Sequence, residues 1–202
     1  MSIFKRIFGK SNPKTGEGTS SERGKYMPEV KLPVDERFTI NFKKNGGKFL
    51  YCDSDYELRE AFANILDENY WHQEKVLCYD EELKDTFKDF QVDYTRNRSD
   101  AAFFLTTCEY LVGDNGAILI SSNQIAEKKL HELPDNFVVY ATTSQLVETI
   151  GEGLRGIKNK HKDCIPSNIT TIKNFHIDEK EKDFLSYGSS TKNLYLLLLE
   201  DL

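Results

Sequence analysis

The chain has 202 residues, of which 39% are hydrophobic and 30% are charged, so we expect one domain with a buried core, with or without a tail. This composition excludes a wholly disordered chain, a collagen-like chain and a coiled coil, and no apolar run approaches the ~18 residues that a membrane-spanning helix needs. The net charge of −6 is uneven, because residues 1–25 carry six Lys and Arg against two Glu; the rest therefore carries −10, which argues against broad binding of nucleic acid.

The first 25 residues have the composition of a basic, flexible tail. Residues 9–24 contain four Gly, three Ser and two Thr but no aromatic residue, which is typical of a linker. Ahead of them, a short helix would gather four apolar side chains on one face, at Ile3, Phe4, Ile7 and Phe8. Residues 1–10 could therefore contact a membrane surface or a partner protein. They could equally be an unstructured start, since so short a helix is marginal in water.

From residue 26 onward, the apolar pattern alternates between helix and strand, which predicts a folded domain over residues 26–202. Its first half shows a helix that begins near Asp35 and ends at Asn45-Gly46-Gly47, a strand at Lys48–Cys52, a helix capped by Asp53 or Ser54, a strand at Lys75–Tyr79 and a helix from Asp80. Its second half shows strands at Ala101–Leu105, Gly116–Ser122, Phe137–Ala141, Ile169–Ile172 and Asn193–Leu199, and a helix capped by Thr142, Thr143 or Ser144 that runs to Ile157. Strand–helix alternation predicts an α/β fold with a mostly parallel sheet.

The cysteines and the common catalytic motifs give no sign of a metal, a cofactor or a catalytic residue. Four cysteines, Cys52, Cys78, Cys108 and Cys164, are widely spaced without a CxxC pair, so a zinc ribbon or an iron–sulfur cluster held by this chain alone is not expected. Cys52 and Cys78 lie in apolar runs and are predicted to be buried. The signatures GxSxG, HExxH and GxGxxG are absent. We expect no export signal, and therefore a cytoplasmic protein with reduced thiols.

Polar residues beside apolar strands are the candidates for a ligand site, because a parallel α/β sheet binds ligands beyond the carboxyl ends of its strands. Three clusters are expected to line one crevice for a small anion: Thr106, Thr107, Glu109, Asp114, Asn115 and Gly116; then Asn168, Thr170 and Thr171; then Gly188, Ser189, Ser190, Thr191 and Lys192. Lys192 is the fixed cation among them. The last cluster precedes its strand, so it reaches the carboxyl edge only if that strand is antiparallel or its loop folds over. The alternative interpretation is that these residues form structural turns and caps.

The order of these clusters resembles the LUD domain family, whose best-known member is lactate-utilisation protein C. The resemblance lies in Leu111–Leu119 with Asp114 and Gly116, in the turn Leu133-Pro134 before a strand, and in the closing strand within Lys192–Asp201. The chain departs from the family pattern at three places: Asn115 replaces a Thr, Ser189 stands where the family has a His, and a Gly-Pro-Ser-x-Thr-Ala-Asp-Ile run is missing near Lys173–His176.

The resemblance implies a three-layer Rossmann-like domain, as in the superfamily of sugar-phosphate isomerases and CoA-transferases. It also implies an accessory protein that binds a small anionic metabolite, linked to lactate utilisation with iron–sulfur partner proteins. Two alternatives stay open, namely an enzyme acting on a phosphorylated sugar or an acyl-CoA, and an interaction module tethered through the tail. An acid–base pair facing a pocket would favour the enzyme, whereas a crevice without one would favour the binding protein.

Overall fold

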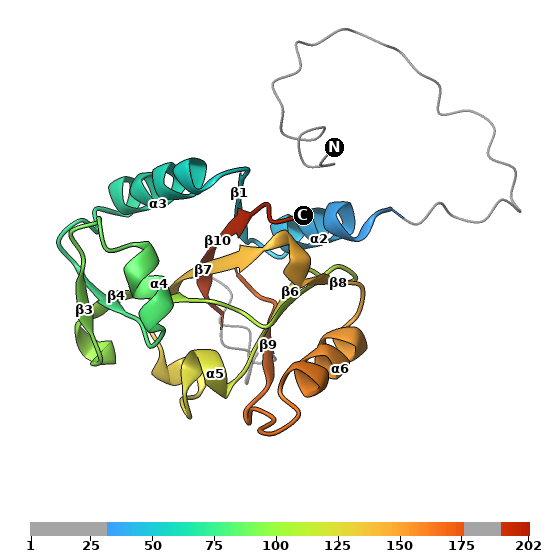
Figure 1. Cartoon of the computed structure of the whole chain (residues 1–202). Helices are drawn as coiled ribbons and strands as arrows, with labels where there is room; N and C mark the ends of the chain where they lie inside the picture. Colours follow the sequence, from blue (N-terminus) through green and yellow to red (C-terminus); the bar gives the residue numbers. More distant parts are fainter. Residues whose placement is uncertain (1–31, 176–190) are drawn as a thin grey trace, which may run out of the picture.

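The computed structural model describes residues 32–175 and 191–202, and at its centre lies a six-stranded sheet, sheet A (Figure 1). Its strands lie in the order β1 (Lys48–Cys52), β10 (Asn193–Leu199), β7 (Asn136–Thr142), β4 (Ala101–Thr106), β2 (Lys75–Leu77) and β3 (Asp93–Thr95). Every neighbouring pair is parallel, which confirms the predicted α/β fold. The basic tail, with residues 1–10, lies outside the described residues.

Two helices cover one face of sheet A, and both begin at the predicted caps. The Ser54 side chain accepts a hydrogen bond from the Glu57 backbone N–H at 3.3 Å and starts α3 (Asp55–Asn69). Asp80 accepts one from the Leu83 N–H at 3.1 Å and starts α4 (Glu81–Thr86). The apolar sides of these helices pack on the strands in one buried cluster that includes Leu58, Phe62, Ile65, Leu83, Phe103, Leu105, Val138 and Leu197.

The other face of sheet A is covered by α2 (Val34–Lys44) and by a second sheet, sheet B. The order in sheet B is β8 (Leu146–Val147), β5 (Tyr110–Val112), β6 (Ala117–Ile120) and β9 (Thr170–Ile172). A further buried cluster joins α2 and sheet B to sheet A, with Phe38, Phe42, Ile118, Phe104, Val139 and Leu196 among its members. Sheet A therefore lies between two covering layers, as the predicted three-layer arrangement requires. The short helix α5 (Ser122–Ile125) follows β6.

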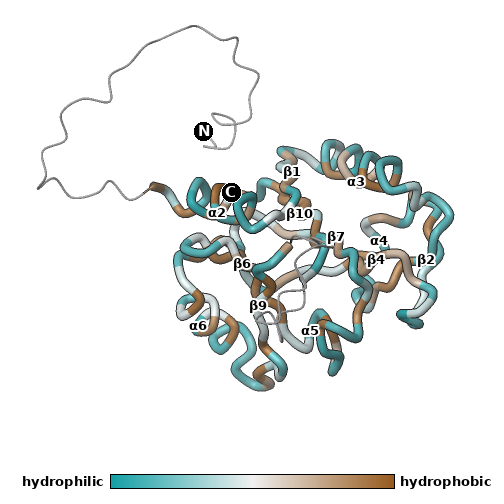
Figure 2. The backbone as a smooth tube through the Cα atoms, turned by 180° about the vertical axis from the view of Figure 1, so that it is seen from behind, coloured by the Kyte–Doolittle hydropathy of each residue, from teal (hydrophilic) through white to brown (hydrophobic). Residues whose placement is uncertain are grey.

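The helix α6 (Ile150–Lys160) packs closely on sheet B through its glycines. A Cβ atom at Gly153 would lie 2.4 Å from Cδ1 of Leu119, and one at Gly156 would lie 2.3 Å from the hydroxyl of Tyr110. Figure 2 shows the same partition along the chain, with the outward turns of α3 and α6 hydrophilic and the strands between them largely hydrophobic. Within residues 32–175 and 191–202, no helix combines the length and the apolar composition needed to cross a membrane.

The region around residue 146 differs from the sequence-based prediction. In place of a helix capped by Thr142, Thr143 or Ser144, the chain forms a 3-10 turn, η3 (Thr143–Gln145), then β8, and α6 begins only at Ile150. The apolar pair Leu146–Val147 lies at helical spacing from Ile150, yet it pairs with β5 as a strand. The strands β3 and β5, of three residues each, were not predicted.

Candidate functional site

The predicted residues Asp114, Asn115 and Gly116 form a turn between β5 and β6 that is held against α2. Asn41 donates from Nδ2 to two carbonyl oxygens of the turn, at 2.9 and 3.1 Å. Asn45, one helical turn further on, donates to the Asn115 carbonyl oxygen at 2.7 Å. Arg37, one helical turn earlier, forms an ion pair with Asp114. Polar side chains on one side of α2 thus bind this turn, so Asp114, Asn115 and Gly116 have a structural role.

Glu109 is a carboxylate buried inside the protein, with 3% of its surface exposed. Its Oε1 accepts hydrogen bonds from Ser121 Oγ at 2.7 Å, Asn123 Nδ2 at 2.9 Å and Gln124 Nε2 at 3.3 Å, and its Oε2 lies 3.7 Å from His161 Nε2. Burial by itself raises the pKa of Glu109, but the three donors and the positive charge of Lys160 together outweigh it, so the pKa lies below its ordinary value.

This lowered pKa predicts how the stability of the protein depends on pH. A group whose folded pKa is lowered stabilises the protein above its unfolded pKa, and that contribution is lost as the pH falls through the folded value. We expect Glu109→Gln to lower the free energy of unfolding by about 1–3 kcal/mol at pH 6. Urea denaturation should show this difference shrinking between pH 6 and pH 3. Glu74→Gln, at an exposed carboxylate, should not show it; a constant difference for Glu109→Gln would contradict the prediction.

Thr106 ends β4 at the carboxyl edge of sheet A, and Thr107 follows it. Thr106 is buried, with 2% of its surface exposed, and its Oγ1 donates to the Thr107 carbonyl oxygen at 3.2 Å. The next residue, Cys108, is buried as well, and burial and the Glu109 carboxylate raise the pKa of its thiol. A thiol with a raised pKa is a poor nucleophile at neutral pH. Among the described residues, no three His, Cys, Asp or Glu side chains gather where they could hold a metal ion.

The second predicted cluster lies in sheet B rather than at an edge of sheet A. Thr170 and Thr171 belong to β9 and pair with Ile120 and Leu119 of β6. Asn168 precedes β9 with a φ of 51°, a left-handed conformation that Asn tolerates. These threonines are thus built into a strand.

Lys192, the cation of the third cluster, is buried and makes hydrogen bonds that stabilise the fold. Its side chain is buried, and Nζ donates to the carbonyl oxygens of Leu133 at 3.0 Å and Pro134 at 2.9 Å. Because β10 is parallel to β7, Lys192 lies at the amino end of sheet A, opposite Thr106. Thr191 directly precedes it, and Gly188, Ser189 and Ser190 lie outside the described residues. The structure therefore does not bring the described members of the three clusters into one crevice.

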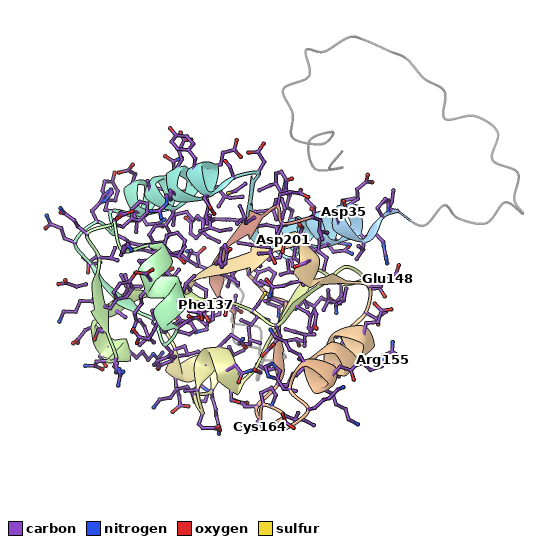
Figure 3. The ribbon with its side chains drawn as sticks, in the orientation of Figure 1. Asp35, Phe137, Glu148, Arg155, Cys164 and Asp201 are labelled. Carbon is purple, nitrogen blue, oxygen red and sulfur yellow. The ribbon has the colours of Figure 1, made fainter. Side chains whose placement is uncertain are left out.

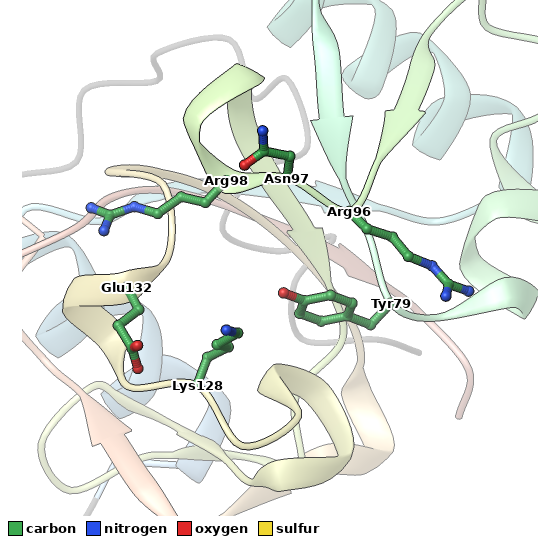
Figure 4. A pocket seen from close by; sticks show the side chains of 6 residues that line it. All are labelled: Tyr79, Arg96, Asn97, Arg98, Lys128 and Glu132. Carbon is green, nitrogen blue, oxygen red and sulfur yellow. The ribbon is translucent and has the colours of Figure 1, made fainter.

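A cavity of about 300 Å³ lies elsewhere on the molecule (Figure 4). Six side chains line it, namely Tyr79, Arg96, Asn97, Arg98, Lys128 and Glu132; we call it the basic cavity. Its wall comes from three segments that are far apart in the sequence. Tyr79 follows β2, residues 96–98 connect β3 to β4, and Lys128 and Glu132 lie between α5 and β7.

The orientation of these side chains leaves polar groups facing the space between them. The ring of Tyr79 packs edge-on against Phe104 with centroids 5.7 Å apart. Its hydroxyl and the ammonium of Lys128 point into the basic cavity, whereas the guanidinium of Arg96 extends away from it (Figure 4). Arg98 and Glu132 lie on the opposite side of the basic cavity from Tyr79.

The segment that carries Lys128 is braced by neighbouring residues. Asn168 donates from Nδ2 to the Lys128 carbonyl oxygen at 2.9 Å, and Ser167 Oγ donates to Glu127 Oε1 at 3.0 Å. Ala126 has φ 52° and ψ −136°, a conformation that favours glycine and costs of order 1–3 kcal/mol in other residues. Asn168, predicted to touch a ligand, thus fixes the backbone of a cavity residue.

The basic cavity carries an excess of positive charge. Arg98 and Lys128 face a single carboxylate, Glu132, while the guanidinium of Arg96 points outward, and none of the three cations has an ion pair among the described residues. Burial, and then the Glu132 carboxylate, raise the pKa of Tyr79, so its hydroxyl is a hydrogen-bond donor at neutral pH. Guanidinium, ammonium and hydroxyl groups together suit a carboxylate or a phosphate.

Sequence reasoning missed this cavity for an identifiable reason. The rule that polar residues after an apolar strand are candidates would have selected residues 96–98, had β3 been recognised. Tyr79 was assigned to the end of a strand, whereas β2 ends at Leu77. Lys128 and Glu132 lie on an irregular segment, which no periodicity marks.

Comparison with known proteins supports the same fold. The family model of the LUD domain matches residues 36–195. A crystal structure of a DUF162 family protein from Deinococcus radiodurans is similar to the chain, with a TM-score of 0.59 and 15% sequence identity, over 83% of this chain and 96% of that one. At this identity the likeness shows the fold alone. No curated protein matches the chain.

Proposed function

The chain belongs to the LUD domain family, and from this premise we propose that it is an accessory protein that binds a small anionic metabolite in the basic cavity. The observation that carries the proposal is the presence of two cations, Arg98 and Lys128, that face one cavity without ion pairs among the described residues, in a chain whose net charge is −6. Cations that gather in this way on an acidic protein attract anions and hold them by charge-assisted hydrogen bonds.

The size and the donors of the basic cavity support a small ligand. A volume of about 300 Å³ is at the lower end for ligand pockets. Arg98 supplies a planar guanidinium that can bind two oxygens of one anion, Lys128 supplies an ammonium, and Tyr79 supplies a hydroxyl from the opposite wall. The pair of Glu109 and His161, which could act as an acid and a base, does not line the cavity, so we propose binding rather than catalysis.

We extend the proposal to a role in lactate utilisation, together with iron–sulfur partner proteins in the cytoplasm. What supports this extension is the resemblance of Leu111–Leu119 and of the closing strand to lactate-utilisation protein C. It is independent of the binding proposal, because the basic cavity could serve an anion of another pathway.

Reversal of one charge in the cavity tests the proposal. We expect inorganic phosphate and L-lactate to bind the full chain in calorimetry, and Arg98→Glu to weaken that binding at least about tenfold, since it removes a charge-assisted hydrogen bond and adds repulsion. Arg155→Glu is the matched control, because Arg155 is an exposed cation on α6, away from the cavity (Figure 3).

Each outcome of that experiment has a distinct meaning. Equal losses in Arg98→Glu and Arg155→Glu would contradict a site at the basic cavity, because only the overall charge would then matter. Binding of phosphate without lactate would support the anion site and overturn the extension to lactate. Absence of binding for both anions would overturn the proposed function.

A further inference from the structure

We propose that the basic cavity selects anions that also carry hydroxyl groups, and that Glu132 is the residue that determines this specificity. The inference rests on the proposed function, because it concerns the ligand of the same cavity. It starts from the one feature of the wall that does not suit a simple anion, which is a carboxylate among cations.

Glu132 is held in place by one of its two carboxylate oxygens. Its Oε2 accepts a hydrogen bond from the backbone N–H of Lys129 at 2.7 Å, at the start of η2 (Leu130–Glu132). No other hydrogen bond or ion pair of the Glu132 side chain is found within the described part of the chain, so Oε1 is available as an acceptor. The Lys129 N–H also keeps the pKa of Glu132 low, so the group is a carboxylate at neutral pH.

The charged side chains of the basic cavity therefore act on an anionic ligand in two opposite ways. Arg98 and Lys128 attract an anionic group, while Glu132 repels it unless the ligand places a donor there. A ligand with a hydroxyl near its anionic group turns that repulsion into a charge-assisted hydrogen bond. Such a site discriminates strongly between the two kinds of ligand. It attracts the anion that carries a hydroxyl, and it leaves the carboxylate of Glu132 unpaired and repulsive toward the anion that lacks one.

A matched pair of phosphate esters isolates this effect. Glycerol 3-phosphate and propyl phosphate have the same anionic group and the same number of carbons, but only the first has hydroxyls. We expect the wild-type chain to bind glycerol 3-phosphate at least about tenfold more tightly in calorimetry.

Glu132→Gln then tests the residue. The glutamine oxygen can still accept from the Lys129 N–H, which leaves its NH₂ group, a donor, where the free carboxylate oxygen was. We expect propyl phosphate to bind this variant more tightly, glycerol 3-phosphate more weakly, and the ratio to fall to about threefold or less. Glu60→Gln, at an exposed carboxylate of α3 across sheet A, should keep the wild-type ratio.

The outcomes separate this inference from the proposed function. Equal affinities for the two esters in the wild type, or an equal loss of both in Glu132→Gln, would overturn the selection of hydroxyls while leaving an anion site in place. Failure of both esters and of inorganic phosphate to bind would overturn the proposed function, and this inference with it.

Discussion

Gly116→Ala should lower the free energy of unfolding by about 3–5 kcal/mol, which would leave a domain of ordinary stability close to unfolding. A Cβ atom at this position would lie 2.4 Å from the backbone nitrogen of Phe42 and 2.5 Å from the carbonyl carbon of Asn41. Hydrogen-bonded backbone atoms of a helix cannot move aside cheaply, so either α2 or the turn must shift. Gly116 also has a φ of 66°, which costs a residue with a Cβ roughly 1–2 kcal/mol more.

Gly151→Ala on α6 provides the control. Its Cβ atom would meet only the Thr149 Oγ1, at 3.8 Å, and its backbone is not in the left-handed region. Alanine is the better helix former, so this variant should be as stable as the wild type or slightly more stable. Urea denaturation of the two variants gives the comparison. A Gly116→Ala variant within about 1 kcal/mol of the wild type would show that the turn is not packed on α2 as described.

The elements that sequence patterns predicted are those with strong local signals. Ser54 and Asp80 could be predicted as helix caps because each cap hydrogen bond joins residues only three apart in the sequence. β10 is recognisable because its apolar run is buried on both faces of sheet A. In contrast, β8 is a strand only because β5 lies beside it, and no local pattern contains that information.

The candidate site depended on information that lies outside any local pattern. The three predicted clusters are adjacent to strands, but whether they meet depends on strand direction and on which sheet each strand joins. β9 is part of sheet B rather than of sheet A, and β10 is parallel to its neighbours, so Lys192 lies at the amino end of sheet A. The basic cavity was missed because it assembles from Tyr79, residues 96–98 and an irregular segment near Lys128.

Lys192 illustrates how a cation near a glycine-containing turn can serve the fold instead of a ligand. The residue is 1% exposed, and its ammonium lies 5.3 Å from the centre of the Phe137 ring. Burial lowers the pKa of Lys192, while Asp135, whose Oδ1 lies 3.5 Å away, acts in the opposite direction. The carbonyl oxygens of Leu133 and Pro134 have this ammonium as their donor, and these two hydrogen bonds help to offset the cost of burying it.

Lys192→Met should therefore lower the free energy of unfolding by about 2–4 kcal/mol, since it keeps the apolar stem and leaves two buried carbonyl oxygens without this donor. Lys192→Ala should cost more, because it also removes the packing of the stem on Phe137. Urea denaturation measures both. Because Glu132 directly precedes Leu133, anion affinity should fall in both variants through the loosened cavity wall, although Lys192 does not line the cavity. A Lys192→Met variant as stable as the wild type, with anion binding abolished, would reverse this assignment and make Lys192 a ligand group after all.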